Sequence, residues 1–393
     1  MSDFDRVITR DRRSRKYGQL KTMFGTEDVL PMWIADMEFT TPEPVLHTLR
    51  EVVSQPVQGY NMEHPQWRQS VCGWYKKRYD ISIDEAWLHF VPGVIKTIVL
   101  SIMALTEKGD TILTCTPVYD PYPNLIKTSG RNLVQTRLVE KNGIYELDWH
   151  DFREKVKTCK MFLFSSPHNP GGIVWDRATL EEINRCCHQA DVIVVSDEVH
   201  CDLTLPPQQH IPFFTLSASS NCKSIVFTSI SKAFNTPAIQ GGIALIKNDA
   251  LRNTFYHFLD NCYLAETNSI QQAAIYSAYT HCDSWIEKLL SYLAANVAYV
   301  KQEVEKNCPL ISVIYGGASY LVFLNAQKMG LSDAQLMSFF VHNARLGLSP
   351  GIQYGPGGEG HMRLNIACPR SQLEESMKRL KAAYESCGFL LHK

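Results

Sequence analysis

The chain has 393 residues, and its 39 Lys and Arg residues nearly balance its 40 Asp and Glu residues, for a formal net charge of −1. This length exceeds what one hydrophobic core usually supports, so we expect two domains. Charges of both signs are mixed along the chain, which excludes the strongly basic surface typical of nucleic-acid or anionic-membrane binders, and neither partner is expected.

The N-terminal segment, residues 1–44, is predicted to form an arm and part of a smaller domain. Its first 18 residues mix acidic and basic side chains and lack the apolar stretch of a signal peptide. No later segment approaches the roughly 18 apolar, uncharged residues of a membrane span. The 12 cysteines are scattered and include no C-x-x-C pair, which favours reduced thiols. We therefore expect a soluble, cytoplasmic protein.

Residues 45–283 are predicted to form the larger domain. Short apolar runs alternate there with helical patterns, and the runs cover residues 111–115, 161–164, 192–195, 225–227 and 242–246. Near-continuous apolar strands separated by helices predict a buried, mostly parallel sheet in an α/β fold. The helical patterns include residues 178–190 and 94–105. The second follows Pro92-Gly93, and its N-terminus suits a phosphate.

Residues 284–393 are predicted to form a second, smaller α/β domain. Asp283 is expected to cap a long helix over 284–306 that bridges the two domains. The patterns that follow predict a strand at 320–324, a helix at 333–344, a strand at 362–367 and a final helix from Ser371.

Polar residues that follow the apolar runs are the candidate site, because ligands of open parallel sheets lie outside the carboxyl ends of the strands. Four such residues are Tyr119, Asn169, Asp197 and Lys232. They are the groups that pyridoxal 5'-phosphate (PLP) requires. A lysine forms an imine with its aldehyde, a carboxylate keeps the pyridine nitrogen protonated, an amide binds the ring hydroxyl and an aromatic ring stacks on the cofactor.

Each of these residues also has a simpler interpretation. Lys232 alone could be a surface lysine, and Tyr119 could be an ordinary core aromatic. The acidic residues and histidine within 197–202 could resemble a metal site, but a strand end sends alternate side chains to opposite faces, and no second His or Cys cluster completes a ligand shell. We therefore expect no metal. Arg363, in an apolar strand pattern, needs either a structural or a substrate carboxylate.

Seven motifs in a fixed order carry a resemblance to a known family. They are Met32-Trp33-Ile34-Ala35-Asp36-Met37-Glu38-Phe39, Gly59-Tyr60, Pro117-Val118-Tyr119, residues 166–172 (SPHNPGG), residues 196–200 (SDEVH), residues 231–235 (SKAFN) and residues 363–370 (RLNIACPR). Together they resemble fold-type I PLP-dependent transferases (aspartate aminotransferase-like). Within these, the W-x-A-D-M-[DE]-F and D-E-x-H variants resemble the MalY/PatB-type carbon-sulfur lyases.

The resemblance implies a large domain with a mostly parallel seven-stranded sheet and a smaller C-terminal domain. It also implies that Lys232, Asp197 and Tyr119 are catalytic, with Lys232 as the imine lysine, Asp197 as the pyridinium partner and Tyr119 as the stacking ring. Asn169 is implied as the ligand of the ring hydroxyl. His200 stands near the cofactor where many aminotransferases have a tyrosine.

The same resemblance implies the remaining contacts. The cofactor phosphate is expected on the backbone amides of Val94 and Ile95 and the hydroxyl of Ser229, with Tyr60 reaching it from the second subunit of a homodimer with shared sites. Arg363 is expected to grip the substrate carboxylate, and Ala35 and Asn169 to line the substrate site. Many aminotransferases place an arginine for the phosphate eight residues beyond the lysine, where this chain has Gln240.

The function implied is α,β-elimination from a β-thio amino acid. L-Cystathionine is the leading substrate, with L-cysteine and S-alkyl cysteines as rivals, and the products are a thiol, pyruvate and ammonia. The first alternative is a class I/II aminotransferase, which uses the same residues but keeps the Cβ substituent. The second is a PLP-binding regulator that also binds a transcription factor as partner.

Overall fold

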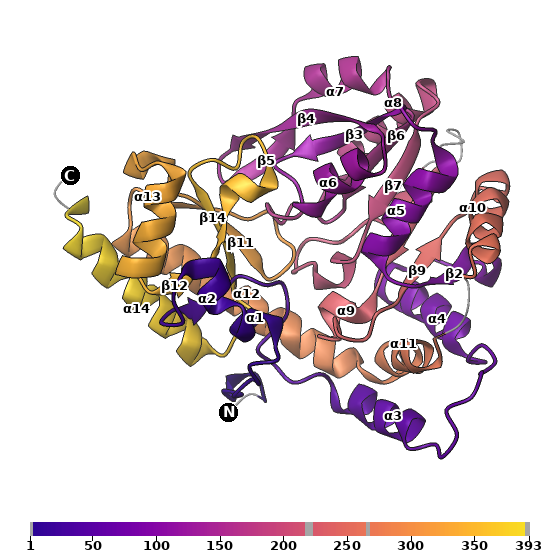
Figure 1. Ribbon diagram of the computed structural model, residues 1–393, viewed down its shortest axis with the longest axis horizontal. Helices are drawn as coiled ribbons and strands as arrows, with labels where there is room; N and C mark the ends of the chain where they lie inside the picture. The colour runs from indigo at the N-terminus through magenta and orange to yellow at the C-terminus, as the bar shows by residue number, and fades with distance from the viewer. Residues whose placement is uncertain (1–2, 217–222, 265–267, 390–393) are drawn as a thin grey trace.

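A computed structural model describes residues 3–216, 223–264 and 268–389. The larger of its sheets has eight strands, drawn in magenta and neighbouring colours on the right of Figure 1. In spatial order they are β2 (Leu88–Val91), β9 (Gly242–Leu245), β8 (Ser224–Thr228), β7 (Ile193–Asp197), β6 (Met161–Ser165), β3 (Thr111–Thr116), β4 (Asn132–Lys141) and β5 (Ile144–Leu147).

The strand pairing confirms the α/β fold with a mostly parallel sheet. The neighbours from β8 through β4 are parallel, and the pairs β2–β9, β8–β9 and β4–β5 are antiparallel. The expected number of seven strands is wrong, because the described sheet has eight. Strand β5 lies at the edge of this sheet and joins it through a half-exposed hairpin with β4. Its turn, Asn142-Gly143, has φ of 53° and 77°, as a tight hairpin requires.

Both faces of this sheet are covered, which explains why its strands read as continuous apolar runs. In β6, Met161 and Leu163 belong to one buried cluster, and Phe162 and Phe164 belong to the other. The first cluster includes α5 (Val94–Leu105), α6 (Pro121–Thr128) and α10 (Asp249–Asn261). The second includes α3 (Glu43–Val53), α4 (Trp67–Tyr79), α7 (Trp149–Val156), α8 (Arg177–Gln189) and α11 (Ser269–His281).

A smaller, four-stranded antiparallel sheet lies in the C-terminal part, on the left of Figure 1. Its order is β10 (Ser312–Ile314), β11 (Leu321–Asn325), β14 (His361–Asn365) and β13 (Ser349–Pro350). The helices of this part are α12 (Asp283–Asn307), α13 (Asp333–Ser338) and α14 (Arg370–Ser386). The N-terminal segment joins it, with α1 (Arg15–Gly18), α2 (Leu20–Phe24) and a parallel pair of β1 (Leu30–Pro31) with β12 (Leu346–Gly347).

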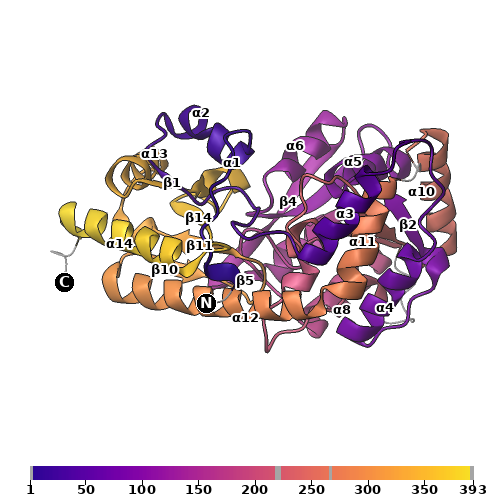
Figure 2. The same cartoon turned by 90° about the horizontal axis from the view of Figure 1, so that it is seen from below.

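The long helix α12 runs from the smaller sheet to the helices beside the larger one (Figure 2). The predicted cap of this helix is wrong. Cys282 is the N-cap, and Asp283 is the first helical residue, where its carboxylate forms an ion pair with Lys77 at 2.7 Å. The helix predicted for 333–344 is also shorter, because α13 ends at Ser338 and a π-helical turn, Phe339–Asn343, follows.

The division into residues 1–44, 45–283 and 284–393 stays a prediction, and residues 1–2 and 390–393 of the outer two units lie outside the described part. Every strand of the larger sheet falls within 45–283, and every strand of the smaller sheet falls within 284–393. Among the helices of the described ranges, none is long and apolar enough to cross a membrane.

Candidate active site

One cavity of about 680 Å³ lies at the carboxyl ends of β3, β6, β7 and β8, between the larger sheet and the C-terminal part. All but one of the residues predicted for the site line it. They are Ala35, Val94, Ile95, Tyr119, Asn169, Asp197, His200, Ser229, Lys232 and Arg363. Tyr60 is the exception. The structure therefore brings together residues that are spread over more than 300 positions of the chain.

Lys232 lies in the short helix α9 (Ile230–Ala233), which begins directly after β8. Ser229 is the N-cap of this helix and accepts a hydrogen bond from the backbone N–H of Ser231 at 3.2 Å. The Lys232 ammonium donates to the carbonyl oxygen of Ala35 at 2.7 Å. Burial and the nearby charge of Arg363 lower the pKa of Lys232 to about 8. About a tenth of the amine is therefore neutral at pH 7, far more than for an ordinary lysine, and the neutral form is the one that acts as a nucleophile or base.

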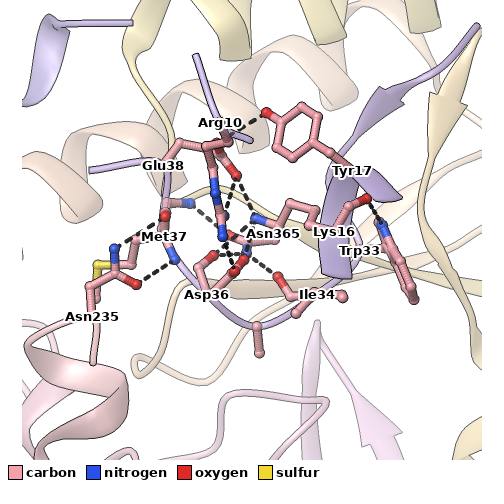
Figure 3. A network of polar contacts seen from close by, with 12 residues as sticks. Arg10, Lys16, Tyr17, Trp33, Ile34, Asp36, Met37, Glu38, Asn235 and Asn365 are labelled. Atoms are coloured by element: carbon pink, nitrogen blue, oxygen red, sulfur yellow. Dashed lines mark hydrogen bonds and ion pairs between the residues drawn. The ribbon is translucent and has the colours of Figure 1, made fainter. Parts of the chain in front are cut away.

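Asp36, the residue after Ala35, belongs to a buried charge cluster, defined as Arg10, Lys16, Asp36 and Glu38 (Figure 3). The Lys16 Nζ lies 2.7 Å from Asp36 Oδ1 and 2.8 Å from Glu38 Oε1, and Arg10 lies 2.8 Å from Asp36 Oδ2. Lys16 is only 1% exposed. This charge cluster links Arg10 and Lys16 to the backbone segment 34–38, which contains Ala35.

Two asparagines and a tyrosine also bond to the backbone of residues 34–37. Asn365 donates to the carbonyl oxygens of Ile34 and Asp36 at 2.6 and 2.7 Å, and Asn235 bonds to the backbone of Met37 (Figure 3). The Tyr320 hydroxyl donates to the Ala35 carbonyl at 2.9 Å. The Ala35 carbonyl, which accepts the hydrogen bond from Lys232, is thus part of a backbone segment fixed by several hydrogen bonds.

Asp197 ends β7 at the bottom of the cavity. Its Oδ2 accepts from the Tyr122 hydroxyl at 2.6 Å, and its Oδ1 accepts from the backbone N–H of Val199 at 3.2 Å. Burial raises the pKa of Asp197 to about 6, against the opposing effect of these two hydrogen bonds. Both donors are uncharged, so a cation in the cavity would find an unneutralised carboxylate.

Arg363 lies on β14 and is 5% exposed. Its guanidinium donates to Asn169 Oδ1 at 3.1 Å and to the carbonyl oxygen of Trp33 at 2.9 Å, and it stacks 5.1 Å from the ring centre of Tyr354. Its Nε is buried without a hydrogen-bond partner among the described residues. These uncharged partners leave a buried cation that a carboxylate would stabilise.

Tyr119 and His200 line the cavity beside these charges. The Tyr119 ring lies edge-on to Tyr122, with 5.5 Å between ring centres. His200 Nδ1 and Ser319 Oγ lie 3.1 Å apart. Burial, helped by the charges of Lys232 and Arg363, holds the pKa of His200 well below its usual value, so its ring is neutral.

The other acidic residues of the 197–202 segment bond elsewhere. Glu198 pairs with His210 at 2.7 Å, and Asp202 accepts from Trp74 and Tyr79 at 2.8 Å each. Within the part of the chain that the structure describes, no three His, Cys, Asp or Glu side chains are grouped to hold a metal ion.

Tyr60 does not reach the cavity of its own chain. It lies in the loop between α3 and α4 and is fully exposed, at 104%. Val57 and Met62 beside it are 79% and 90% exposed. Three apolar or aromatic side chains in one stretch are therefore presented to the outside of the chain.

Sequence reasoning missed several residues that contribute to the site. Tyr122 lies only three residues beyond Tyr119, and Tyr320 is the first residue of a predicted strand. Their positions next to predicted features could therefore have identified both as candidates. Lys16 and Arg10 carried no local signal, because their partners lie about 20 to 28 residues away. Lys96, which also lines the cavity, lies in the predicted phosphate-binding helix.

The fold and the cavity together define an aspartate-aminotransferase-like protein. Residues 28–380 match the family described as aminotransferase class I and II, and the chain belongs to this family. Cystathionine beta-lyase PatB of Bacillus subtilis (strain 168) is 33% identical over 373 residues, 94% of this chain and 96% of that protein. Protein MalY of Escherichia coli (strain K12) is 28% identical over 385 residues, 97% and 98% of the two chains. The crystal structure of cystalysin from Treponema denticola, which contains PLP, superposes with a TM-score of 0.93 at 28% identity, over 98% of this chain and 100% of that chain.

Proposed function

We propose that the protein is a PLP-dependent carbon-sulfur β-lyase that cleaves L-cystathionine, or a related cysteine thioether, to a thiol, pyruvate and ammonia. One observation carries the proposal. A single cavity holds an amine with a lowered pKa, a buried carboxylate and a buried guanidinium whose hydrogen-bond partners in the described ranges are uncharged. The 33% identity with a protein named as a cystathionine beta-lyase, PatB, supports the lyase reaction over transamination.

The residues present fit PLP. Lys232 supplies the amine for its aldehyde, and Asp197, whose described hydrogen-bond donors are uncharged, supplies the carboxylate for its ring nitrogen. Asn169 and Tyr119 line the same cavity and would hold the ring hydroxyl and the ring face. When bound, PLP supplies an aldehyde that bonds to amines and a protonated ring that withdraws electrons from Cα of the substrate.

The chain's own residues bind and orient the substrate. Arg363, positioned by Asn169 and the Trp33 carbonyl, binds the α-carboxylate through a planar guanidinium suited to two parallel hydrogen bonds. This contact aims the Cα–H bond at Lys232. Lys232, once the substrate amine has displaced it from the aldehyde, would accept the Cα proton on its neutral Nζ, and a pKa of about 8 would let the same nitrogen give the proton up again near neutrality. Asp197 stays ionised and keeps the ring nitrogen protonated.

The reaction is tested by incubating the purified protein with PLP and L-cystathionine and assaying thiol and pyruvate together. A lyase releases both in equal amounts, and Lys232→Ala should release neither. Reduction with borohydride should fix the cofactor mass on the peptide that contains Lys232. In a parallel assay with an added α-keto acid to accept the amino group, a keto acid formed from the amino acid without thiol release would identify an aminotransferase instead.

We also propose that the protein is a homodimer with shared active sites, in which Tyr60 completes the cavity of the partner subunit. The support is the exposure of Val57, Tyr60 and Met62 and the absence of Tyr60 from the residues lining its own cavity. Tyr60→Phe should remain dimeric and bind PLP less tightly. Mixing Lys232→Ala and Tyr60→Phe chains should restore one intact site per heterodimer. If subunit exchange is shown by mass spectrometry without any gain in rate or in PLP affinity, Tyr60 serves its own chain.

We propose the cytoplasm as the compartment. All eleven cysteines within the described ranges are free, whereas oxidising compartments favour disulfides. Fractionation of the source cells with an antibody to the protein tests this. Recovery in an extracellular or periplasmic fraction contradicts it.

A further inference from the structure

Four basic side chains line the cavity in the described part of the chain, and the proposed function leaves Lys96 and Arg15 without a role. Arg15 belongs to the N-terminal helix α1, on the C-terminal part of the molecule. Lys96 lies in the first turn of α5, on the side of the larger sheet. Its ammonium donates a hydrogen bond to the side-chain oxygen of Gln240, which also lines the cavity.

Strand pairing brings these two residues together, although 144 positions separate them. β2 ends at Val91, which pairs with Gly242, the first residue of β9. Lys96 follows β2, and Gln240 precedes β9. Ser229, at the end of the neighbouring strand β8, donates to the carbonyl oxygen of Gly241 at 2.9 Å. Lys96 and Gln240 therefore lie at the end of the cavity that contains Ser229, Val94 and Ile95, the predicted phosphate contacts.

Without Lys96, the predicted phosphate contacts supply only backbone N–H groups and the hydroxyls of Ser229 and of Tyr60 from the second subunit. The phosphate of PLP is an anion that is stabilised best by ionised donors. Gln240, which stands where many aminotransferases have an arginine, is uncharged. A lysine ammonium carries three donors, so the bond to Gln240 leaves two free.

We propose that Lys96, oriented by Gln240, supplies the positive charge that binds the cofactor phosphate in this chain. The inference rests on the proposed function, because it assumes that PLP occupies the cavity. The positive charge at the phosphate then comes from α5, whereas in many aminotransferases it comes from the segment that also contains the imine lysine. Gln240 acts as a positioning residue that keeps the flexible lysine side chain over the cavity.

The test compares the affinity of the full-length apoprotein for PLP and for pyridoxal, which lacks the phosphate, by absorbance titration. Lys96→Met should weaken PLP binding about tenfold and leave pyridoxal binding unchanged. Tenfold is at the low end of the effect expected for a hydrogen bond to a charged group, because Lys96 is exposed. Lys96→Arg should retain most of the affinity. Lys127→Met is the matched control, because Lys127 is exposed on α6 and does not line the cavity.

A second variant separates a charge effect from a local disturbance. Gln240→Arg in the Lys96→Met background should restore PLP affinity, because it returns a cation to the same place. Equal losses for PLP and pyridoxal, or no loss for PLP, overturn the assignment of Lys96. Failure of the wild-type chain to bind PLP at all would instead overturn the proposed function.

Discussion

Replacing Lys16 by methionine tests the importance of the buried charge cluster under the active site. The variant removes the ammonium that lies within 2.8 Å of both Asp36 and Glu38, whose side chains are only 11% and 4% exposed. Methionine keeps most of the length and apolar volume of the lysine stem. The packing of α1 is therefore largely preserved, and the loss is mainly one of charge.

The expected loss of stability follows from leaving two buried carboxylates with Arg10 alone. Breaking a buried ion pair by removing one partner costs about 3–5 kcal/mol. Arg10 remains 2.8 Å from Asp36 and 3.3 Å from Glu38, so we expect about 3 kcal/mol at pH 7, the lower end of that range. Arg12→Met is the matched control. Its pair with Glu27 spans 3.0 Å but is 82% and 52% exposed, so its removal should change stability little.

The pH dependence of the stability loss shows whether the lost charge causes it. Burial raises the pKa of Asp36, but Lys16 and Arg10 together outweigh it and hold the pKa below its ordinary value. In the wild type this carboxylate contributes stability above its unfolded pKa of about 4, which is lost as the pH falls through the folded value. Without Lys16 the pKa of Asp36 should rise, so the gap between variant and wild type should narrow as the pH falls from 7 to 5.

The assay is urea denaturation of wild type, Lys16→Met and Arg12→Met at both pH values, with unfolding monitored by circular dichroism. A Lys16→Met chain within about 1 kcal/mol of the wild type at pH 7 would refute the reasoning, since a surface pair is worth no more. An equal loss at pH 7 and pH 5 would show that packing, not charge, is responsible.

Three further predictions concern the catalytic groups. Asp197→Ala should lower kcat by about a hundredfold or more while the protein stays folded, because the ring nitrogen loses the carboxylate that keeps it protonated; steady-state kinetics with unchanged circular dichroism checks this, and a near wild-type rate would point to another proton source. Arg363→Lys should raise KM by roughly tenfold or more with a smaller change in kcat, because lysine keeps the charge but lacks the paired donors; a kcat loss alone would argue against a carboxylate contact. The rate at which apoprotein reacts with PLP should rise with pH to a midpoint near 8, because the neutral amine of Lys232 is the reactive form and its pKa is lowered to about 8; a midpoint near 10 would mean an ordinary exposed lysine.

The sequence alone determined the α/β fold and the core of the active site. The runs that became β3, β6, β7 and β8 are apolar at consecutive positions because helices cover both faces of the sheet. Parallel strands end at one edge, so the polar residues after these runs had to converge. Tyr119, Asn169, Asp197 and Lys232 were predicted to meet on this basis, and they line one cavity.

Only the tertiary structure decided which residues orient these groups. Arg363 bonds to Asn169 across 194 positions, and Tyr122 bonds to Asp197 across 75. The Ala35 carbonyl meets Lys232 across 197 positions, because the N-terminal segment pairs with β12 and is held by Lys16. Periodicity and local motifs report how each segment meets the solvent and the core, but they carry no information on its distant neighbours. Those contacts depend on how the layers pack against one another, and packing is a property of the whole chain.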